Sequence, residues 1–149
     1  TTSSPAVVIG FDSQGHGKYY KDEKRYDIKS KGFYAVASKN FHFLGLMGID
    51  GGINYSLEKE DKDTDPNIFC GAYKTIGKSL TAVAEYDFAT NDNQSHPLNG
   101  LGNGYFNCGA ELQINEQFSL KVLAHDIFLN RPNVDSFNRS VQINYRWNY

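Results

Sequence analysis

The sequence lacks any apolar run near the ~20 residues that a membrane-spanning helix needs, and its mean hydropathy is −0.53. No segment has the 3.6-residue periodicity of an amphipathic helix. A negative mean hydropathy does not exclude membrane-spanning strands, because lipid-facing and inward-facing residues alternate along them and average out. The sequence therefore excludes membrane helices and leaves strand-based architectures.

A strong charge of either sign is also missing. The net charge is −2 and the pI is about 6.0, which gives no support for a nucleic-acid partner. The four histidines include no pair with metal-ligand spacing. We therefore expect no metal and no cofactor.

The most informative stretch is Val141 to Tyr149, in which apolar or aromatic residues alternate with polar ones. Successive side chains of a strand point to opposite faces, so this strand has one apolar face and one polar face. The alternative is an amphipathic edge strand of a soluble sheet.

The same alternation recurs along the 149 residues, which suit a single domain. Eight strands are expected, at about 6–12, 32–41, 45–56, 67–74, 79–89, 104–114, 118–128 and 138–149. The loops after the first, third, fifth and seventh strands are long and polar, whereas the others are short. Transmembrane barrels have this asymmetry.

The chain as a whole resembles the small eight-stranded outer-membrane barrels, the class of the OmpA transmembrane domain and OmpX. The stretch from Phe33 to Phe41 is also similar to a segment of outer-membrane proteins linked to exopolysaccharide secretion. The resemblance implies an all-β, eight-stranded antiparallel up-and-down transmembrane β-barrel. It also implies a bacterial outer membrane location, periplasmic termini and insertion by the barrel-assembly machinery. The assembly signal would be Val141, Ile143, Tyr145, Trp147 and Tyr149.

The strand patterns predict which face meets lipid. In strand 79–89, Leu80, Ala82 and Ala84 share a face opposite Glu85 and Asp87. A lipid-facing Lys or Arg at mid-bilayer would cost ~2–4 kcal/mol, so the charged faces should line the lumen. Six residues are expected to form a structural ion network there: Glu85, Asp87, Glu111, Lys121, His125 and Arg146.

Specific pairings follow from the hairpins. A turn around Glu116 places Glu111 opposite Lys121, and we expect these two to form an ion pair joined by Arg146. A two-residue turn at Ile76-Gly77 would place Tyr73 opposite Leu80. That register turns Cys70 to the lumen and Cys108 to lipid, so both thiols should be free because their Cβ vectors diverge.

Aromatic residues lie near the strand ends, where a girdle at the membrane interface would need them. The expected girdle residues are Tyr73, Tyr86, Phe88, Tyr105, Phe118, Trp147 and Tyr149. The alternative is that aromatics simply favour strands.

The leading functional expectation is a non-enzymatic outer-membrane barrel that displays four loops for structural, anchoring or adhesion roles, with an unidentified envelope partner. A small channel for ions or apolar molecules is a second possibility, favoured by Gly48, Gly52 and Gly109 in the lumen. A lipid-modifying enzyme is a third, although His125 and Asp126 point to opposite faces and no serine is expected near His125. A soluble lipocalin-like carrier is a fourth. The acidic loop from Glu58 to Asp65 lacks a calcium-loop pattern and is interpreted as a solvated loop.

Overall fold

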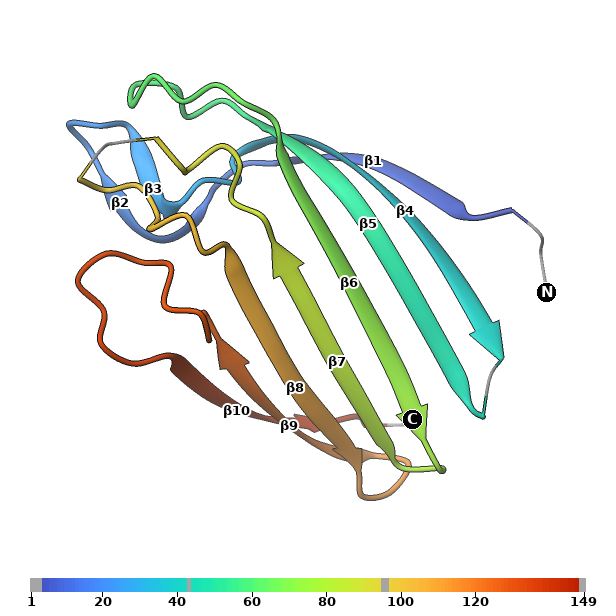
Figure 1. The fold of residues 1–149 in the computed structure, drawn as a ribbon. Coiled ribbons are helices and arrows are strands. Elements are labelled where there is room, and N and C mark those ends of the chain that lie inside the picture. Colours follow the sequence, from blue (N-terminus) through green and yellow to red (C-terminus); the bar gives the residue numbers. More distant parts are fainter. Residues whose placement is uncertain (1–3, 43, 95–96, 148–149) are drawn as a thin grey trace.

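The computed structural model describes residues 4–42, 44–94 and 97–147. In that part of the chain it contains ten strands and no helix (Figure 1), so no helix there could cross a membrane. The strands are β1 (Ala6–Asp12), β2 (His16–Tyr20), β3 (Arg25–Ile28), β4 (Gly32–His42), β5 (Leu46–Ser56), β6 (Asn67–Ile76), β7 (Leu80–Asp87), β8 (Tyr105–Gln113), β9 (Phe118–His125) and β10 (Asn138–Tyr145).

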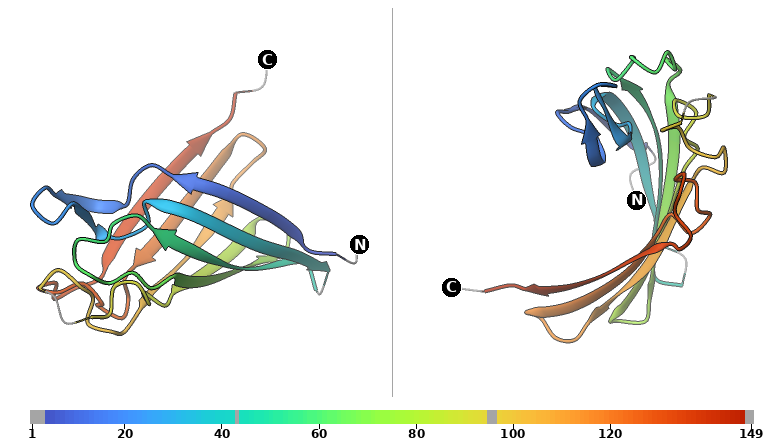
Figure 2. Two further views of the ribbon diagram at one scale, coloured as in Figure 1. Left: turned by 90° about the horizontal axis from the view of Figure 1, so that it is seen from above. Right: turned by 90° about the vertical axis from the view of Figure 1, so that its left-hand side faces the viewer.

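Eight of these strands form one antiparallel sheet in the order β1-β4-β5-β6-β7-β8-β9-β10. The remaining two, β2 and β3, form a separate hairpin, which follows β1 and precedes β4 in the sequence. The large sheet is strongly curved, and its two edge strands β1 and β10 lie apart rather than pairing (Figure 2). The hairpin lies on the concave side of the sheet at the end that carries the long loops (Figures 1 and 2).

The eight expected strands and their antiparallel order are confirmed, with bounds that differ by only a few residues. Long connections and short turns alternate as predicted and lie at opposite ends of the sheet (Figure 1). The sheet is open, however, so the predicted closed barrel is confirmed only as far as its strands and their order.

The β6–β7 hairpin differs from the prediction. Strand β6 continues to Ile76, which pairs with Leu80, and the turn is Gly77–Ser79 with Gly77 at a φ of 65°. The shift by an odd number of residues reverses the face of every side chain on β6. Cys70 consequently pairs with Tyr86 and shares the apolar face with Cys108, so its predicted inward position is wrong. Both thiols are free, as expected.

The polarity of this fold is inverted relative to a water-soluble domain. The buried hydrophobic residues among those described are only Ala89 and Tyr105, whereas fourteen polar or charged residues are buried. Large apolar side chains are instead exposed, including Ile9 at 79% and Val141 at 66%. The described chain therefore has no hydrophobic core of the ordinary kind.

Glycines on the concave face make room for large side chains that lie against the sheet. A Cβ at Gly10 would meet the Tyr34 ring, one at Gly48 the Tyr73 ring, and one at Gly52 the Phe69 ring. The glycines thus lie under aromatic rings, so they do not indicate an open lumen.

The glycine pair at 51 and 52 tests this packing. A Cβ at Gly52 would lie 2.5 Å from the Phe69 ring and 2.6 Å from the Ala35 carbonyl oxygen, whereas one at Gly51 on the opposite face has only an ordinary contact at 3.7 Å. Overpacking of this kind costs ~1–3 kcal/mol. We therefore expect Gly52→Val to lower the denaturant midpoint clearly and Gly51→Val to change it little. Equal effects of the two substitutions would contradict the packing described.

Candidate functional site

The convex face of the sheet is apolar across all eight strands. The registers align its side chains in rows, one of which runs from Val141 through Val122, Ala110 and Ala82. Its long cations are near strand ends, with Lys39 and Lys74 toward the short turns and Arg139 at the start of β10. Such side chains can extend their charged groups beyond an apolar surface. Lys39 is three residues from the end of β4 and Lys74 two from the end of β6, and β1, β5, β7, β8 and β9 carry no Lys or Arg on this face.

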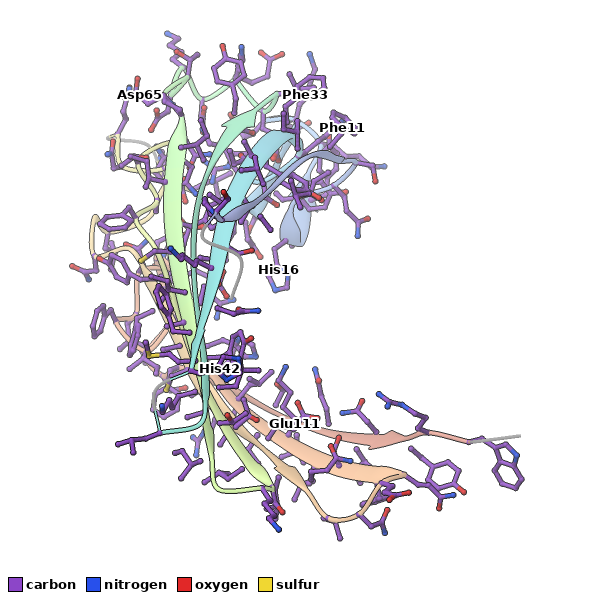
Figure 3. All side chains as sticks on the ribbon, turned by 90° about the vertical axis from the view of Figure 1, so that its right-hand side faces the viewer. Phe11, His16, Phe33, His42, Asp65 and Glu111 are labelled. Atoms are coloured by element: carbon purple, nitrogen blue, oxygen red, sulfur yellow. The ribbon has the colours of Figure 1, made fainter. Side chains whose placement is uncertain are left out.

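Aromatic residues form two bands on this convex face. Toward the long loops, Phe11 contacts Phe33 and the rings of Tyr86, Phe88, Phe106 and Phe128 form one cluster. Phe11 and Phe33 are labelled in Figure 3. Toward the short turns, Phe118 pairs with Tyr145, whose ring contacts Trp147. The short-turn group is confined to β9 and the end of β10, whereas the group toward the long loops extends over several strands.

Two predicted girdle residues lie elsewhere. Tyr73 is on the concave face, where its hydroxyl donates to Asn40. Its prediction as a girdle residue is wrong because it depended on the incorrect β6–β7 register. Tyr105 is on the concave face as well, only 3% exposed, and belongs to the loop cluster described below. Tyr149 lies outside the described residues.

The six residues predicted to face inward all lie on concave rows or at their ends. Glu111 is directly opposite Lys121, as predicted, and Figure 3 shows Glu111 on the concave side. The expected ion pair does not form, because the Glu111 carboxylate accepts from the Ser119 hydroxyl at 2.7 Å. Arg146 lines the same surface pocket as Glu111 without an ion pair between them. The predicted network is therefore not connected in this open sheet.

His125 has an unpredicted neighbour. Ser140 of β10 lies on the same face, and its Oγ is 3.1 Å from His125 Nε2. The expectation that no serine lies near this histidine on the same face is wrong, because Ser140 of the neighbouring strand β10 is there. Asp126 is turned away, toward Asn130 and Arg131, so this contact does not form a catalytic triad with the adjacent carboxylate.

A cluster of charged side chains is buried among the long loops. Arg25 of β3 is 0% exposed. Its guanidinium is 2.7 Å from Asp61 of loop 57–66 and 2.7 Å from Asp92 of loop 88–104, and it also donates to Asn99. Lys29 adds a bond to Asp61 at 2.8 Å. We call these five residues, with Glu58 and Tyr105, the polar loop cluster.

Glu58 attaches loop 57–66 to the segment after β2. Its two carboxylate oxygens accept hydrogen bonds from the backbone N–H groups of Tyr26, Ser30 and Lys31. Together with Asp61 and Asp63, it is buried. The interpretation of 58–65 as a solvated loop is therefore wrong for these three residues, whose carboxylates hold the neighbouring loops together.

Asp92 links the cluster to the sheet. Burial raises the pKa of Asp92 to about 6, although Arg25 and the Tyr105 hydroxyl, which donates at 3.0 Å, both stabilise its charged form. Sequence analysis missed this cluster. The available signal was charge complementarity, because segment 18–31 is rich in Lys and Arg while loop 57–66 is rich in Asp and Glu.

No group of three or more His, Cys, Asp or Glu side chains in the described part of the chain is arranged to hold a metal ion. Comparison with family models, curated proteins and solved structures finds no match. Functional inference therefore rests on the geometry of the apolar face, the concave face and the loop cluster.

Arg25 and Lys24 form a matched pair for testing the cluster. Removing one partner of a buried ion pair costs ~3–5 kcal/mol because it leaves an uncompensated charge. Arg25→Met leaves Asp92 without a cationic partner, whereas Asp61 keeps Lys29. The Lys24–Glu60 pair is exposed, so Lys24→Met should have no measurable effect. We expect Arg25→Met alone to remove hydrogen-exchange protection from loops 57–66 and 88–104. Similar exchange in both variants would show that the cluster does not order the loops.

Proposed function

We propose that this chain is an integral protein of a bacterial outer membrane, which it spans with its eight long strands. The convex face contacts lipid, and the polar loop cluster orders the loops at one end for display. The proposed role is structural, anchoring or adhesive, without catalysis. The observation that carries the proposal is the continuous exposed apolar face, with aromatic clusters toward the long loops and at the short-turn end of β9 and β10.

The size of this face supports lipid as its partner. Soluble monomers rarely expose contiguous apolar patches larger than a few hundred Å², and this face extends over every strand of the sheet. The lipocalin-like alternative needs an apolar concave face, whereas Asp50, Glu85, Glu111 and Lys121 lie there. Lipid outside and polar groups inside is the arrangement of a membrane barrel.

In lipid, the open edges must be paired, because unsatisfied backbone N–H and C=O groups are costly in hydrocarbon. We therefore infer that β1 pairs with β10 when the protein is inserted. The row through Val141 crosses the sheet to Phe41 of β4, whereas Phe11 pairs with Phe33. We propose that Val141 pairs with Phe11. The row through Val141 would then return to β4 at Phe33, eight residues from Phe41. This offset is a shear of eight residues, which corresponds to a strand tilt of about 35°.

The two cysteines test lipid contact. Both are on the convex face, Cys70 exposed and Cys108 partly exposed. In lipid vesicles, we expect an apolar maleimide to label both thiols and a sulfonated maleimide to label neither. As a control, a cysteine at Lys78 in the Gly77–Ser79 turn should react with both reagents. Rapid labelling of Cys70 and Cys108 by the sulfonated reagent, or a monodisperse monomer without detergent, would contradict the proposal.

Closure is tested separately by cross-linking. The proposed register places Ile9 opposite Ile143, with both side chains on the convex face. In a background of Cys70→Ser and Cys108→Ser, we expect Ile9→Cys and Ile143→Cys to form an intramolecular disulfide in vesicles when copper phenanthroline and oxygen are added as the oxidant. The pair Ile9→Cys and Gln142→Cys should not, because Gln142 faces the other side. Cross-linking of the second pair alone would refute this register, and only intermolecular products would indicate pairing between copies.

A further inference from the structure

The convex face of the large sheet carries charge of only one sign. Its described strands place three charged side chains on this face, and all three are cations: Lys39 on β4, Lys74 on β6 and Arg139 on β10. Every Asp and Glu of the same eight strands is on the concave face. Within these strands, the apolar face therefore has a net positive charge, which attracts anions.

Two of these cations lie on strands that flank β5, toward the end with the short turns (Figure 1). Phe41, Met47 and Lys74 are paired directly across β4, β5 and β6, so they form one row. Lys39 is two residues from Phe41 on the same face of β4, and its ammonium lies 5.6 Å from the centroid of the Phe41 ring. The Lys39 side chain thus extends toward the row that contains Lys74, and the two cations flank Met47.

The turns next to these lysines add no negative charge. The sequence has no Asp or Glu at 43–45, between β4 and β5, or at 77–79, between β6 and β7, where Lys78 adds a further cation. The surface around the lysines is apolar, with Met47 and Ile49 on the strand between them, and Ile49 is 44% exposed. This part of the face therefore combines two cations with an exposed apolar surface.

The combination indicates which kind of lipid fits. Lys and Arg near a membrane surface attract lipids with a net negative headgroup. A zwitterionic headgroup would bring its own ammonium group next to the two lysines, whereas an anionic headgroup brings only negative charge. The apolar side chains between the lysines match an acyl chain, which a soluble anion does not have.

We propose that Lys39 and Lys74 form a binding site for a phospholipid with a net negative headgroup. The phosphate group lies between the two ammonium groups, and an acyl chain lies against Met47 and Ile49. The site rests on the proposed membrane location and specifies which lipid the convex face selects there. It does not depend on closure of β1 on β10, because three neighbouring strands, β4, β5 and β6, form it.

The test measures which lipid lies next to this site. In a Trp147→Phe background, Ala72→Trp places the only tryptophan on the exposed face, opposite Ile49 of β5. The full-length chain is inserted into phosphatidylcholine vesicles that contain either brominated phosphatidylglycerol or brominated phosphatidylcholine. Bromine quenches a nearby tryptophan, so the ratio of the two quenching curves gives the local lipid preference. We expect phosphatidylglycerol to be preferred at position 72. Val122→Trp, on β9 of the same face, should be quenched equally by both lipids.

Charge variants identify the residues responsible. The attraction of one lysine for an anionic membrane surface corresponds to about fivefold in affinity, so Lys39→Gln and Lys74→Gln should each lower the preference by about that factor. Replacing both lysines by arginine keeps the charges and should keep the preference. Lys78→Gln removes the same charge from the turn at this end of the sheet and should lower the preference less than either of the other two.

The possible results separate the site from the membrane proposal. A preference that survives Lys39→Gln combined with Lys74→Gln, or an equal loss from Lys78→Gln, would show diffuse attraction and overturn the site. Equal quenching by both lipids at position 72 would overturn the site while supporting lipid contact. Absence of quenching at both position 72 and position 122 would overturn lipid contact itself.

Discussion

The fold depends on one constraint, the separation of apolar and charged side chains onto opposite faces of a single curved sheet. A strand turns successive side chains to opposite sides, so each long strand can satisfy this constraint only if it keeps its register with its neighbours. The observed registers do so from β1 to β10, and the row through Val141, Val122 and Ala110 is apolar except for Lys74. A shift by one residue in β7, β8 or β9 would place Glu85, Glu111 or Lys121 on the apolar face.

At the end of the sheet that carries the long loops, buried ion pairs rather than apolar packing hold the chain in place. Three long segments converge there, and the strands beneath them provide little apolar surface for packing. Arg25, Asp61 and Asp92 instead join the segments through charge-assisted hydrogen bonds in a buried position. Buried charges are costly unless they are paired, so these three side chains favour one arrangement of the loops and oppose alternatives. The cluster thereby supplies loop specificity where a hydrophobic core is absent.

The strands were predictable from sequence because their period of two is a local property. The β8–β9 hairpin was predictable in full, down to Glu111 opposite Lys121. The β6–β7 hairpin was not, since a turn containing Gly77 is compatible with two or three residues and the difference reverses Cys70 and Tyr73. The loop cluster depends on contacts such as Arg25 to Asp92, 67 residues apart. The opposite charges of segments 18–31 and 57–66 suggest that the two segments attract each other, but local patterns do not specify which residues pair.

The acidic residues on the concave side of the molecule form two sets, one in the loop cluster and one on β7, and the two sets differ in their partners. In the loop cluster, the acids meet Arg25 and Lys29, and each carboxylate there has a cationic or backbone partner. On β7, Asp87 accepts hydrogen bonds from two neutral donors, the Asn67 amide and the Ala89 N–H. The Glu85 charge is stabilised by Asn107 and by His125. The two parts of the concave side therefore differ in how their buried charges are compensated. Ion pairs hold the acids of the loop cluster, whereas hydrogen bonds from neutral side chains and the backbone hold Asp87 on the sheet.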